Sequence, residues 1–266
     1  MKSFHNKVAV ITGAGSGIGQ ALALALAQQG ARLALSDIDE AGLARTRALL
    51  PEQTDTRLYR LDVTDRAAVD AHAAQVINEF GAVHLLFNNA GSALLGTFAN
   101  QTLEEASWLI DLNLWSVVYC SKAFLPQMLA QREGCIINIS SIAGLVGLPG
   151  LNSYNLVKFA VRGLTESLWS ELAGSGVSAV SVHPGGIRTN IERASRRCAA
   201  AGAVENRMEA ANQRLLVTPP ERCAADILHG IRKGKRRILT GRLSSTIDWL
   251  ARLLPESYPR LLARVL

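Results

Sequence analysis

The sequence has few cysteines and no long apolar run, and these absences exclude two classes of protein. The four cysteines, Cys120, Cys135, Cys198 and Cys223, form no CxxC pair and have no histidine at ligand spacing. We therefore expect reduced thiols and neither a disulfide framework nor a zinc site. The longest apolar run, ALALALA at 21–27, stops at two glutamines and a glycine, far short of the ~18 residues of a membrane span.

The N-terminus also lacks the apolar core and small-residue cleavage site of a secretory signal. We predict a cytoplasmic protein. Aromatic residues make up 5% of the chain, whereas 48% of its 266 residues are hydrophobic and 19% are charged, as in an ordinary globular protein. No internal repeat or flexible linker divides the sequence, so we expect a single domain over 1–266.

Short apolar runs alternate with longer segments of helical period, which is typical of βαβ units and a parallel sheet. The strands are expected at 7–12, 32–36, 56–63, 84–91, 135–140, 177–185 and 236–241, and the helices at 18–29, 40–50, 65–80, 102–131 and 153–173, with Thr64 and Thr102 as N-caps. Continuously apolar strands imply helices on both faces. The predicted fold is a doubly wound α/β sandwich of three layers around a seven-stranded parallel sheet.

Two segments depart from this pattern. Residues 190–217 are rich in arginine and alanine with weak periodicity, and we interpret them as an insertion that covers a substrate. The segment 231–266 has nine Lys and Arg against two acids and so contains the whole net charge of +6. It could lie on an anionic membrane surface, but we favour packing of Ile247, Leu250, Leu253 and Leu254 on the domain or on a second subunit. We expect no nucleic-acid partner, since no recognition helix is present.

A glycine-rich turn, TGAGSGIG at 12–19, follows the first strand and opens the first helix. Glycines let a backbone approach a pyrophosphate, and the free N–H groups of the helix start face its charge. Asp37 ends the second strand, 24 residues after Gly13, where a carboxylate can bind both adenosine ribose hydroxyls and repel a 2′-phosphate. No Lys or Arg stands at position 16 or 38. We therefore favour NAD over NADP, although an acid before a helix could also serve only as a local cap.

Tyr154 and Lys158 lie four residues apart on one predicted helix, so their side chains share a face. Tyrosine titrates near ~10, and a neighbouring ammonium and an oxidised nicotinamide both favour the phenolate. Such a tyrosine could accept the proton of an alcohol while hydride leaves for a cofactor. A tyrosine and a lysine at this spacing are otherwise a common packing pair, so the glycine turn is what makes the catalytic interpretation preferable.

The ordered set of TGAGSGIG, NNAG at 88–91, Asn113, the serine pair at 140–141, YNLVK at 154–158 and PGGIRT at 184–189 resembles the short-chain dehydrogenase/reductase family over about residues 7–190. The resemblance implies that Tyr154 transfers the proton, that Lys158 lowers its pKa and holds the nicotinamide ribose, that Ser141 binds the substrate oxygen, and that Asn113 supports a water-linked proton relay. The further cofactor contacts that it implies are Gly13, Ser16, Gly17, Ile18, Gly19, Asp37, Asp62, Val63, Asn89, Ala90, Gly91, Pro184, Ile187 and Thr189.

The predicted activity is NAD-dependent interconversion of a secondary alcohol and a ketone, with no metal. The substrate pocket is expected from 92–95, 145–150 and 190–217, where Leu94, Leu95, Leu145, Val146 and Leu148 favour a lipophilic molecule and Arg193, Arg196 and Arg197 leave an acidic substituent possible. The alternatives are a non-catalytic NADH-sensing regulator, an NADP-dependent reductase, and an epimerase or dehydratase of the same family. The resemblance also implies a homodimer or homotetramer formed through the helices that carry Asn113 and Tyr154.

Overall fold

The computed structural model describes residues 1–189, 195–213 and 215–265. Within these residues seven parallel strands form one sheet in the order β3-β2-β1-β4-β6-β7-β9. The strands are β1 (Val8–Thr12), β2 (Arg32–Asp37), β3 (Thr56–Arg60), β4 (Leu85–Asn88), β6 (Gly134–Ile139), β7 (Val177–Gly185) and β9 (Arg237–Gly241). The strand order reverses between β1 and β4, and the crevice at such a reversal is where doubly wound folds bind ligands.

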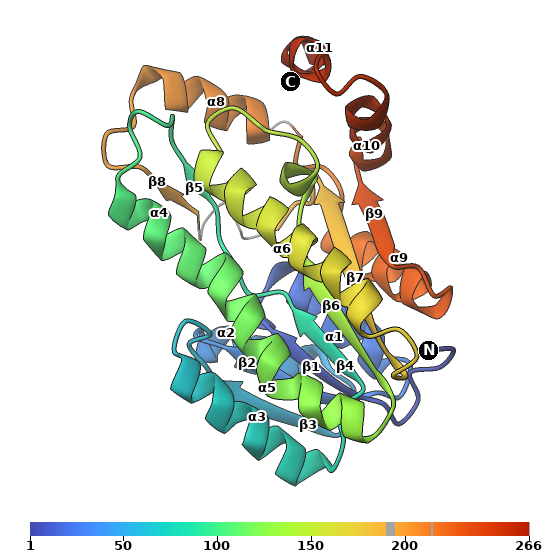
Figure 1. Ribbon diagram of the computed structural model, residues 1–266. Helices are drawn as coiled ribbons and strands as arrows, with labels where there is room; N and C mark the ends of the chain where they lie inside the picture. Colours follow the sequence, from blue (N-terminus) through green and yellow to red (C-terminus); the bar gives the residue numbers. More distant parts are fainter. Residues whose placement is uncertain (190–194, 214, 266) are drawn as a thin grey trace.

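Helices cover both faces of the sheet, as Figure 1 shows. One apolar cluster joins α1 (Gly17–Ala27), α2 (Glu40–Leu49) and α9 (Pro220–Arg232) to the sheet, and a second cluster joins α3 (Arg66–Phe80), α5 (Ser116–Ala130) and α6 (Asn152–Glu171) to the opposite face. Every residue of β1 and of β6 is buried. Continuous burial on two faces explains why these strands have no polar alternation.

The helix predicted over 102–131 is one continuous rod with a wide turn inside it. It consists of α4 (Leu103–Ile110), a π-helical turn at Asp111–Trp115, and α5. Thr102 caps it as predicted: its hydroxyl accepts from the Glu105 N–H, and the Glu105 carboxylate accepts from the Thr102 N–H. The prediction of Thr64 as the cap of α3 was wrong. Asp65 is the N-cap and accepts from Ala68, because the Thr64 hydroxyl donates to Asp62 instead.

The sequence analysis missed α9, α8 (Ala203–Gln213), and a short parallel pair of β5 (Leu94–Leu95) and β8 (Arg196–Arg197). The leucine-rich end of the chain forms two helices, α10 (Ser244–Leu253) and α11 (Tyr258–Val265). Part of the predicted insertion, 190–194 and 214, lies outside the described residues. The rest of that insertion is mainly the helix α8.

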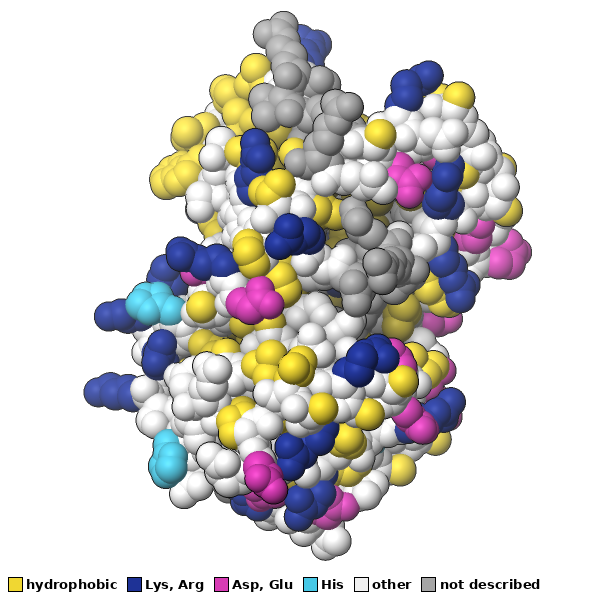
Figure 2. All heavy atoms as spheres, turned by 180° about the vertical axis from the view of Figure 1, so that it is seen from behind, with side chains coloured by type: hydrophobic (Ala, Val, Ile, Leu, Met, Phe, Trp, Pro, Cys, Tyr) yellow, Lys and Arg dark blue, Asp and Glu magenta, His cyan; other side chains and the backbone are white. Residues whose placement is uncertain are grey.

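The basic C-terminal segment packs on the domain through part of its predicted apolar stripe. Ile247 is buried and Leu250 packs beside it, but Leu253 is 69% exposed and Leu254 42% exposed. The first half of the stripe therefore packs on the domain, and packing of Leu253 and Leu254 on a second subunit stays a prediction. Figure 2 shows hydrophobic side chains gathered at the end of the molecule that α10 and α11 form.

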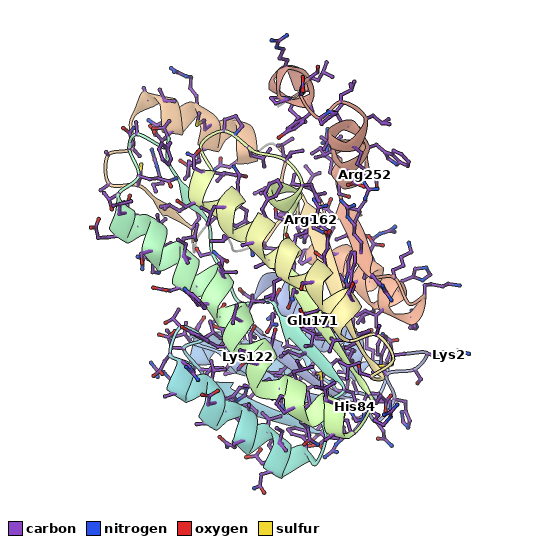
Figure 3. All side chains as sticks on the ribbon, viewed as in Figure 1. Lys2, His84, Lys122, Arg162, Glu171 and Arg252 are labelled. Atoms are coloured by element: carbon purple, nitrogen blue, oxygen red, sulfur yellow. The ribbon has the colours of Figure 1, made fainter. Side chains whose placement is uncertain are left out.

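An ionic contact joins α10 to the sheet. The Asp248 carboxylate accepts from Arg237 of β9 and from the Arg252 Nε at 3.2 Å. Figure 3 places Arg252 on α10 above Arg162 on α6. Burial raises the pKa of Asp248, and the positive charge of Arg162 offsets part of this rise.

Candidate active site

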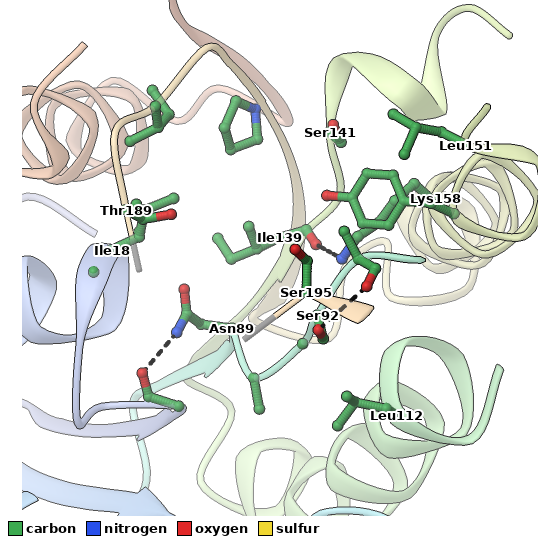
Figure 4. Close-up of a pocket in the computed structure, with 18 of the residues that line it drawn as sticks. Ile18, Asn89, Ser92, Leu112, Ile139, Ser141, Leu151, Lys158, Thr189 and Ser195 are labelled. Carbon is green, nitrogen blue, oxygen red and sulfur yellow. Dashed lines mark hydrogen bonds between the residues drawn. The ribbon is translucent and has the colours of Figure 1, made fainter. Parts of the chain in front are cut away.

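A large cavity opens at the carboxyl ends of the parallel strands. Its volume is about 770 Å³, and residues that follow β1, β2, β3, β4, β6 and β7 all contribute to its lining. Loops after parallel strands converge at this edge because the strands run in one direction. Figure 4 shows part of the wall, with Ile18 and Thr189 on one side and Ser141 and Lys158 on the other.

The glycine turn forms one end of the cavity. Gly13 and Gly17 have φ values of +66° and +54°, a conformation that glycine adopts far more easily than other residues. Ser16 is the N-cap of α1, yet its side chain makes no capping hydrogen bond, so it leaves the first N–H groups of the helix to another acceptor. Ser16, Gly17 and Ile18 line the cavity. This arrangement fits an anionic phosphate group.

Gly19 has a different position from the other glycines of this turn. It is buried outside the cavity lining, and a Cβ added to it would lie 2.1 Å from the Gly13 carbonyl oxygen. Its missing side chain therefore permits the close packing of α1 on the turn.

Thr12 and Asn89 join the glycine turn to the loop after β4. The Thr12 hydroxyl accepts from the N–H groups of Asn89 and Ala90, both at 3.0 Å, and the Asn89 amide donates to the carbonyls of Thr12 and Gly13. Asn89, Ala90 and Gly91 then line the cavity. Asn88 is turned the other way, where its amide donates to Ser121 and Asn138. As the sequence suggested, these asparagines connect strands as well as framing the cleft.

The end of the cavity near β2 and β3 is acidic. Asp37 lines it and accepts from the Gly15 N–H at 2.8 Å and from the Asp39 N–H at 3.0 Å. Asp62 and Val63 also line this end, and the Asp62 carboxylate accepts from the Thr64 N–H and hydroxyl. Among the described residues, no lysine or arginine lines this part of the cavity.

Lys158 and Tyr154 lie together on α6, as their spacing predicted. The Lys158 Nζ is 5.5 Å from the centre of the Tyr154 ring and donates to the Ile139 carbonyl oxygen at 3.0 Å. Lys158 is 6% exposed. Burial disfavours its ammonium and lowers the pKa of Lys158 to about 8.

Tyr154 experiences two opposing effects. Burial raises the pKa of Tyr154, while a hydrogen bond with Ser141 lowers it. The sequence analysis expected Lys158 to depress this pKa, but burial is the larger effect in this structure. Ser141 itself begins a single 3₁₀ turn, where its hydroxyl oxygen accepts from the Ala143 N–H at 3.1 Å. The hydroxyl oxygen is thus an acceptor for Ala143, and its one proton is the donor in the bond with Tyr154.

His183 supports the Ser141 backbone. Its ring is fully buried and hydrogen-bonded to the Ser141 carbonyl oxygen at 3.0 Å and to the Ser181 hydroxyl at 2.9 Å. Burial lowers the pKa of His183 to about 4, so the ring is neutral at pH 7. This agrees with the interpretation of His183 as a satisfied polar residue rather than a catalyst.

Asn113 lies in the π-helical turn between α4 and α5. It is fully buried, and its amide donates to the Ser92 carbonyl at 2.9 Å and accepts from the Ser92 N–H at 3.2 Å. A Cβ on Gly91 would lie 2.3 Å from the Asn113 oxygen. Asn113 is not part of the cavity lining. It holds Ser92 in place, and Gly91 and Ser92 line the cavity.

The remaining predicted cofactor contacts come from the end of β7 and the loop that follows it. Pro184, Ile187 and Thr189 all line the cavity. Of the residues predicted for the substrate pocket, Ser92, Leu95 and Leu148 line it, as do Arg196 and Arg197, whereas Arg193 lies outside the described residues. Three predictions were wrong, because the side chains are buried but are not part of the cavity lining: Leu94, Leu145 and Val146. Leu94 and Val146 pack in apolar clusters behind the wall.

Several lining residues were missed by sequence reasoning. They are apolar and come from α4, the π-helical turn, the residue before α6 and the start of α10: Trp108, Leu112, Leu151, Leu243 and Ile247. Leu215 and Leu216, which also line the cavity, lie within the predicted segment 190–217. The i, i+4 spacing of Trp108 and Leu112, and of Leu243 and Ile247, could have indicated one apolar helix face. It could not indicate that the face borders a cavity.

Comparisons with known proteins agree with this geometry. The short chain dehydrogenase family model matches residues 7–199. The chain is 45% identical over 266 residues to "Putative oxidoreductase SadH" of Mycobacterium tuberculosis, covering 99% of this chain and 96% of that protein. It is 40% identical over 190 residues to a cyclohexanol dehydrogenase of an Acinetobacter species, covering 70% of this chain and 75% of that protein.

A solved structure has the same fold over nearly the whole length. It is a short-chain dehydrogenase/reductase of Burkholderia phymatum in complex with NAD, 34% identical, with a TM-score of 0.88 and coverage of 98% of this chain and 97% of that chain. The family match over most of the sequence, the redox relatives and the shared fold lead to one conclusion. The chain is an oxidoreductase that belongs to the short-chain dehydrogenase/reductase family.

Proposed function

We propose that this protein uses NAD to interconvert a lipophilic secondary alcohol and its ketone. The observation that carries the proposal is the position of Ser141, Tyr154 and Lys158 along one cavity whose other end holds the glycine turn and Asp37. A cofactor extended between these ends would bring its nicotinamide, the hydride acceptor, to the three side chains. The missed lining residues make the substrate end strongly apolar, which supports a lipophilic substrate.

The chain contributes the proton transfer and the orientation of the substrate. With substrate bound, Ser141 would turn its single hydroxyl proton from Tyr154 to the substrate oxygen, on which charge changes during the reaction. Tyr154 would accept the alcohol proton during oxidation and return it during reduction. Because burial raises the Tyr154 pKa, the phenolate then needs the nearby cationic charge of Lys158 and an oxidised nicotinamide.

Asp37 supports the preference for NAD. Its carboxylate stands beside the glycine turn, and the NAD-bound relative has the same overall fold. A 2′-phosphate at this acidic end would meet repulsion and no lysine or arginine among the described lining residues. The predicted relay through Asn113 remains a prediction, as both amide atoms of its side chain bond to Ser92.

The assembly and location remain proposals as well. Trp115, Leu156 and Phe159 are 45%, 55% and 41% exposed on the two helices that the sequence analysis named as the contact between subunits. Such exposure of large apolar side chains supports a homo-oligomer. The part of the chain that the structure describes has no helix with the length and apolar character of a membrane span; a cytoplasmic location and a single domain over 1–266 remain predictions from the sequence.

The deciding experiment follows NADH absorbance with a panel of cyclic and long-chain secondary alcohols. We expect the native protein to reduce NAD faster than NADP and Tyr154→Phe to lose at least about 100-fold in turnover, the usual contribution of general acid–base catalysis. Tyr119→Phe, which removes a hydroxyl outside the cavity lining, should leave turnover unchanged. Binding of NADH without oxidation of any alcohol would favour the sensor alternative instead.

A further inference from the structure

An exposed arginine with no acidic partner among the described residues lies on the wall of the substrate end. Arg196 of β8 lines the cavity, and its guanidinium carbon lies 3.8 Å from the centre of the Trp108 ring. Its backbone N–H donates to the Ala93 carbonyl at 2.9 Å, which holds β8 against β5. A guanidinium over an indole is stabilised by cation–π attraction and presents its N–H groups at the ring edge.

Arg196 lies close to the proposed chemistry. Trp108, which it covers, packs in the apolar cluster that contains Leu94, Leu109 and Val157 and that Tyr154 also contacts. One aromatic side chain thus separates the cation from the cluster around the catalytic tyrosine. Figure 4 shows Ser195, the residue before Arg196, on the same part of the wall as Ser92.

The charges around Arg196 are not balanced. Its neighbour Arg197 pairs with Glu209 at 3.3 Å and also donates to Asn206. Glu209 lines the cavity too, but its charge is offset by that pair. Arg196 has no carboxylate within ion-pair distance in the described residues. An arginine fork in an apolar-walled cavity is complementary to a planar carboxylate, which is costly to bury there without a cation.

We propose that the substrate carries one carboxylate on its apolar body and that Arg196 binds this carboxylate while the carbinol or carbonyl carbon lies at Tyr154. The inference rests on the proposed function and names its substrate class. Two other cations on the lining, Lys158 and Arg242, also have no acidic partner in the described part of the chain. Lys158 lies beside Tyr154, so Arg242 is the one that the experiment must separate from Arg196.

The test compares acids with their neutral esters. Secondary hydroxy acids with the hydroxyl next to the terminal carbon, in a series of chain lengths, are paired with their methyl esters, and kcat/KM for NAD reduction is measured for each. We expect the native protein to prefer the acid over the ester by about ten-fold or more at its best chain length, as a hydrogen-bonded charge pair would give. Arg196→Gln should bring that ratio close to one.

Two matched variants complete the design. Arg207→Gln removes the same charge from an exposed position on α8 outside the cavity. Arg242→Gln removes a second arginine charge from the cavity wall. Both variants should keep the preference for the acid. The inference fails if the native protein oxidises esters as well as acids at every length, or if Arg242→Gln and not Arg196→Gln abolishes the preference. In either case ester oxidation would leave the proposed function intact. If neither acids nor esters are oxidised, both proposals fall.

Discussion

At the scale of single residues, the site combines ionisable groups with strong burial. Lys158 is almost fully enclosed, and its ammonium has one hydrogen-bond partner among the described residues, the Ile139 carbonyl. The cost of burying it is the reason for the lowered Lys158 pKa of about 8. Such a group destabilises the fold and persists where a function requires it.

We predict that Lys158→Met stabilises the protein while impairing turnover. As the pH falls from 10.5 to about 8, the unfolded chain takes up the lysine proton before the folded protein does, so stability declines over this window and the cost is complete below pH 8. Burial of the charged lysine lowers the free energy of unfolding by about 3 kcal/mol. The gain expected from Lys158→Met is this amount less about 1 kcal/mol, because the variant also loses the hydrogen bond to Ile139.

The measurement is urea denaturation of Lys158→Met and the native protein at pH 7 and pH 9.5. The gain in stability should be larger at pH 7 than at pH 9.5. Lys122→Met, which changes an exposed lysine on α5, serves as the control and should show no such pH dependence. An equal difference at both pH values would argue against a buried ammonium at position 158.

At the scale of elements, buried aromatic contacts join the helices to the sheet. The ring of His72 on α3 lies 4.7 Å from that of Tyr59 on β3 and 6.0 Å from that of Phe124 on α5. Both nitrogens of His72 lack a hydrogen-bond partner in the described structure, and burial lowers its pKa to about 4. The ring acts here as an apolar spacer between three elements.

We predict that His72→Phe stabilises the protein most strongly in acid. Above pH 6.5, His72 is neutral in both the folded and the unfolded chain, and its ionisation does not lower the free energy of unfolding. As the pH falls from 6.5 toward 4, the unfolded chain binds a proton before the folded protein does, so the protein loses stability. The loss is at most about 3 kcal/mol. Melting curves at pH 7.5 and pH 5 should show a larger gain for His72→Phe at pH 5, whereas exposed His229→Gln should show none. A gain independent of pH would contradict a titrating His72.

Ile247 of α10 lines the substrate end of the cavity, and α11 packs behind it. The Tyr258 hydroxyl on α11 accepts from the Gly147 N–H at 3.1 Å, and Leu262 and Ile247 pack on Val146. They thereby support the segment after Ser141. The family model matches residues 7–199, while SadH matches 99% of the chain, this segment included.

We expect Tyr258→Phe to raise the substrate KM by about five-fold, because one partly exposed hydrogen bond contributes about 1 kcal/mol. The KM for NAD should not change, since the glycine turn lies at the other end of the cavity. Steady-state kinetics with each substrate varied in turn would check this. A change confined to the KM for NAD would show that α11 does not act on the substrate wall.

At the scale of the whole molecule, the distribution of apolar surface predicts how copies assemble. Leu156 and Phe159 face outward on α6, and Trp115 stacks on Tyr119 at the start of α5. We expect the double substitution Leu156→Glu and Phe159→Glu to convert a dimer or tetramer into smaller species in sedimentation experiments. Leu49→Glu, which changes a residue that is 59% exposed on α2, should leave the assembly intact. A native protein that sediments as a monomer would refute the proposed interface.

Much of the fold was predictable because its signals are local. The alternation of apolar strands and helices, the glycine turn and the Tyr154–Lys158 spacing are each contained in a few neighbouring residues. The strand ends were less certain: the strand expected over 84–91 stops at Asn88, where Thr12 captures the next two N–H groups. That contact joins residues 77 and 78 positions apart, which no local pattern encodes.

The sequence alone determined the class of fold, and it predicted the end of the cavity that suits a dinucleotide and the candidate catalytic residues, since all of these depend on residue type and short spacing. The tertiary structure alone decided which apolar residues face the cavity. Leu94 and Val146 turn away from it, while Trp108 and Ile247 line it. The same structure brought Arg196 onto Trp108. The physical reason is that burial and charge pairing depend on what the rest of the chain packs against each side chain.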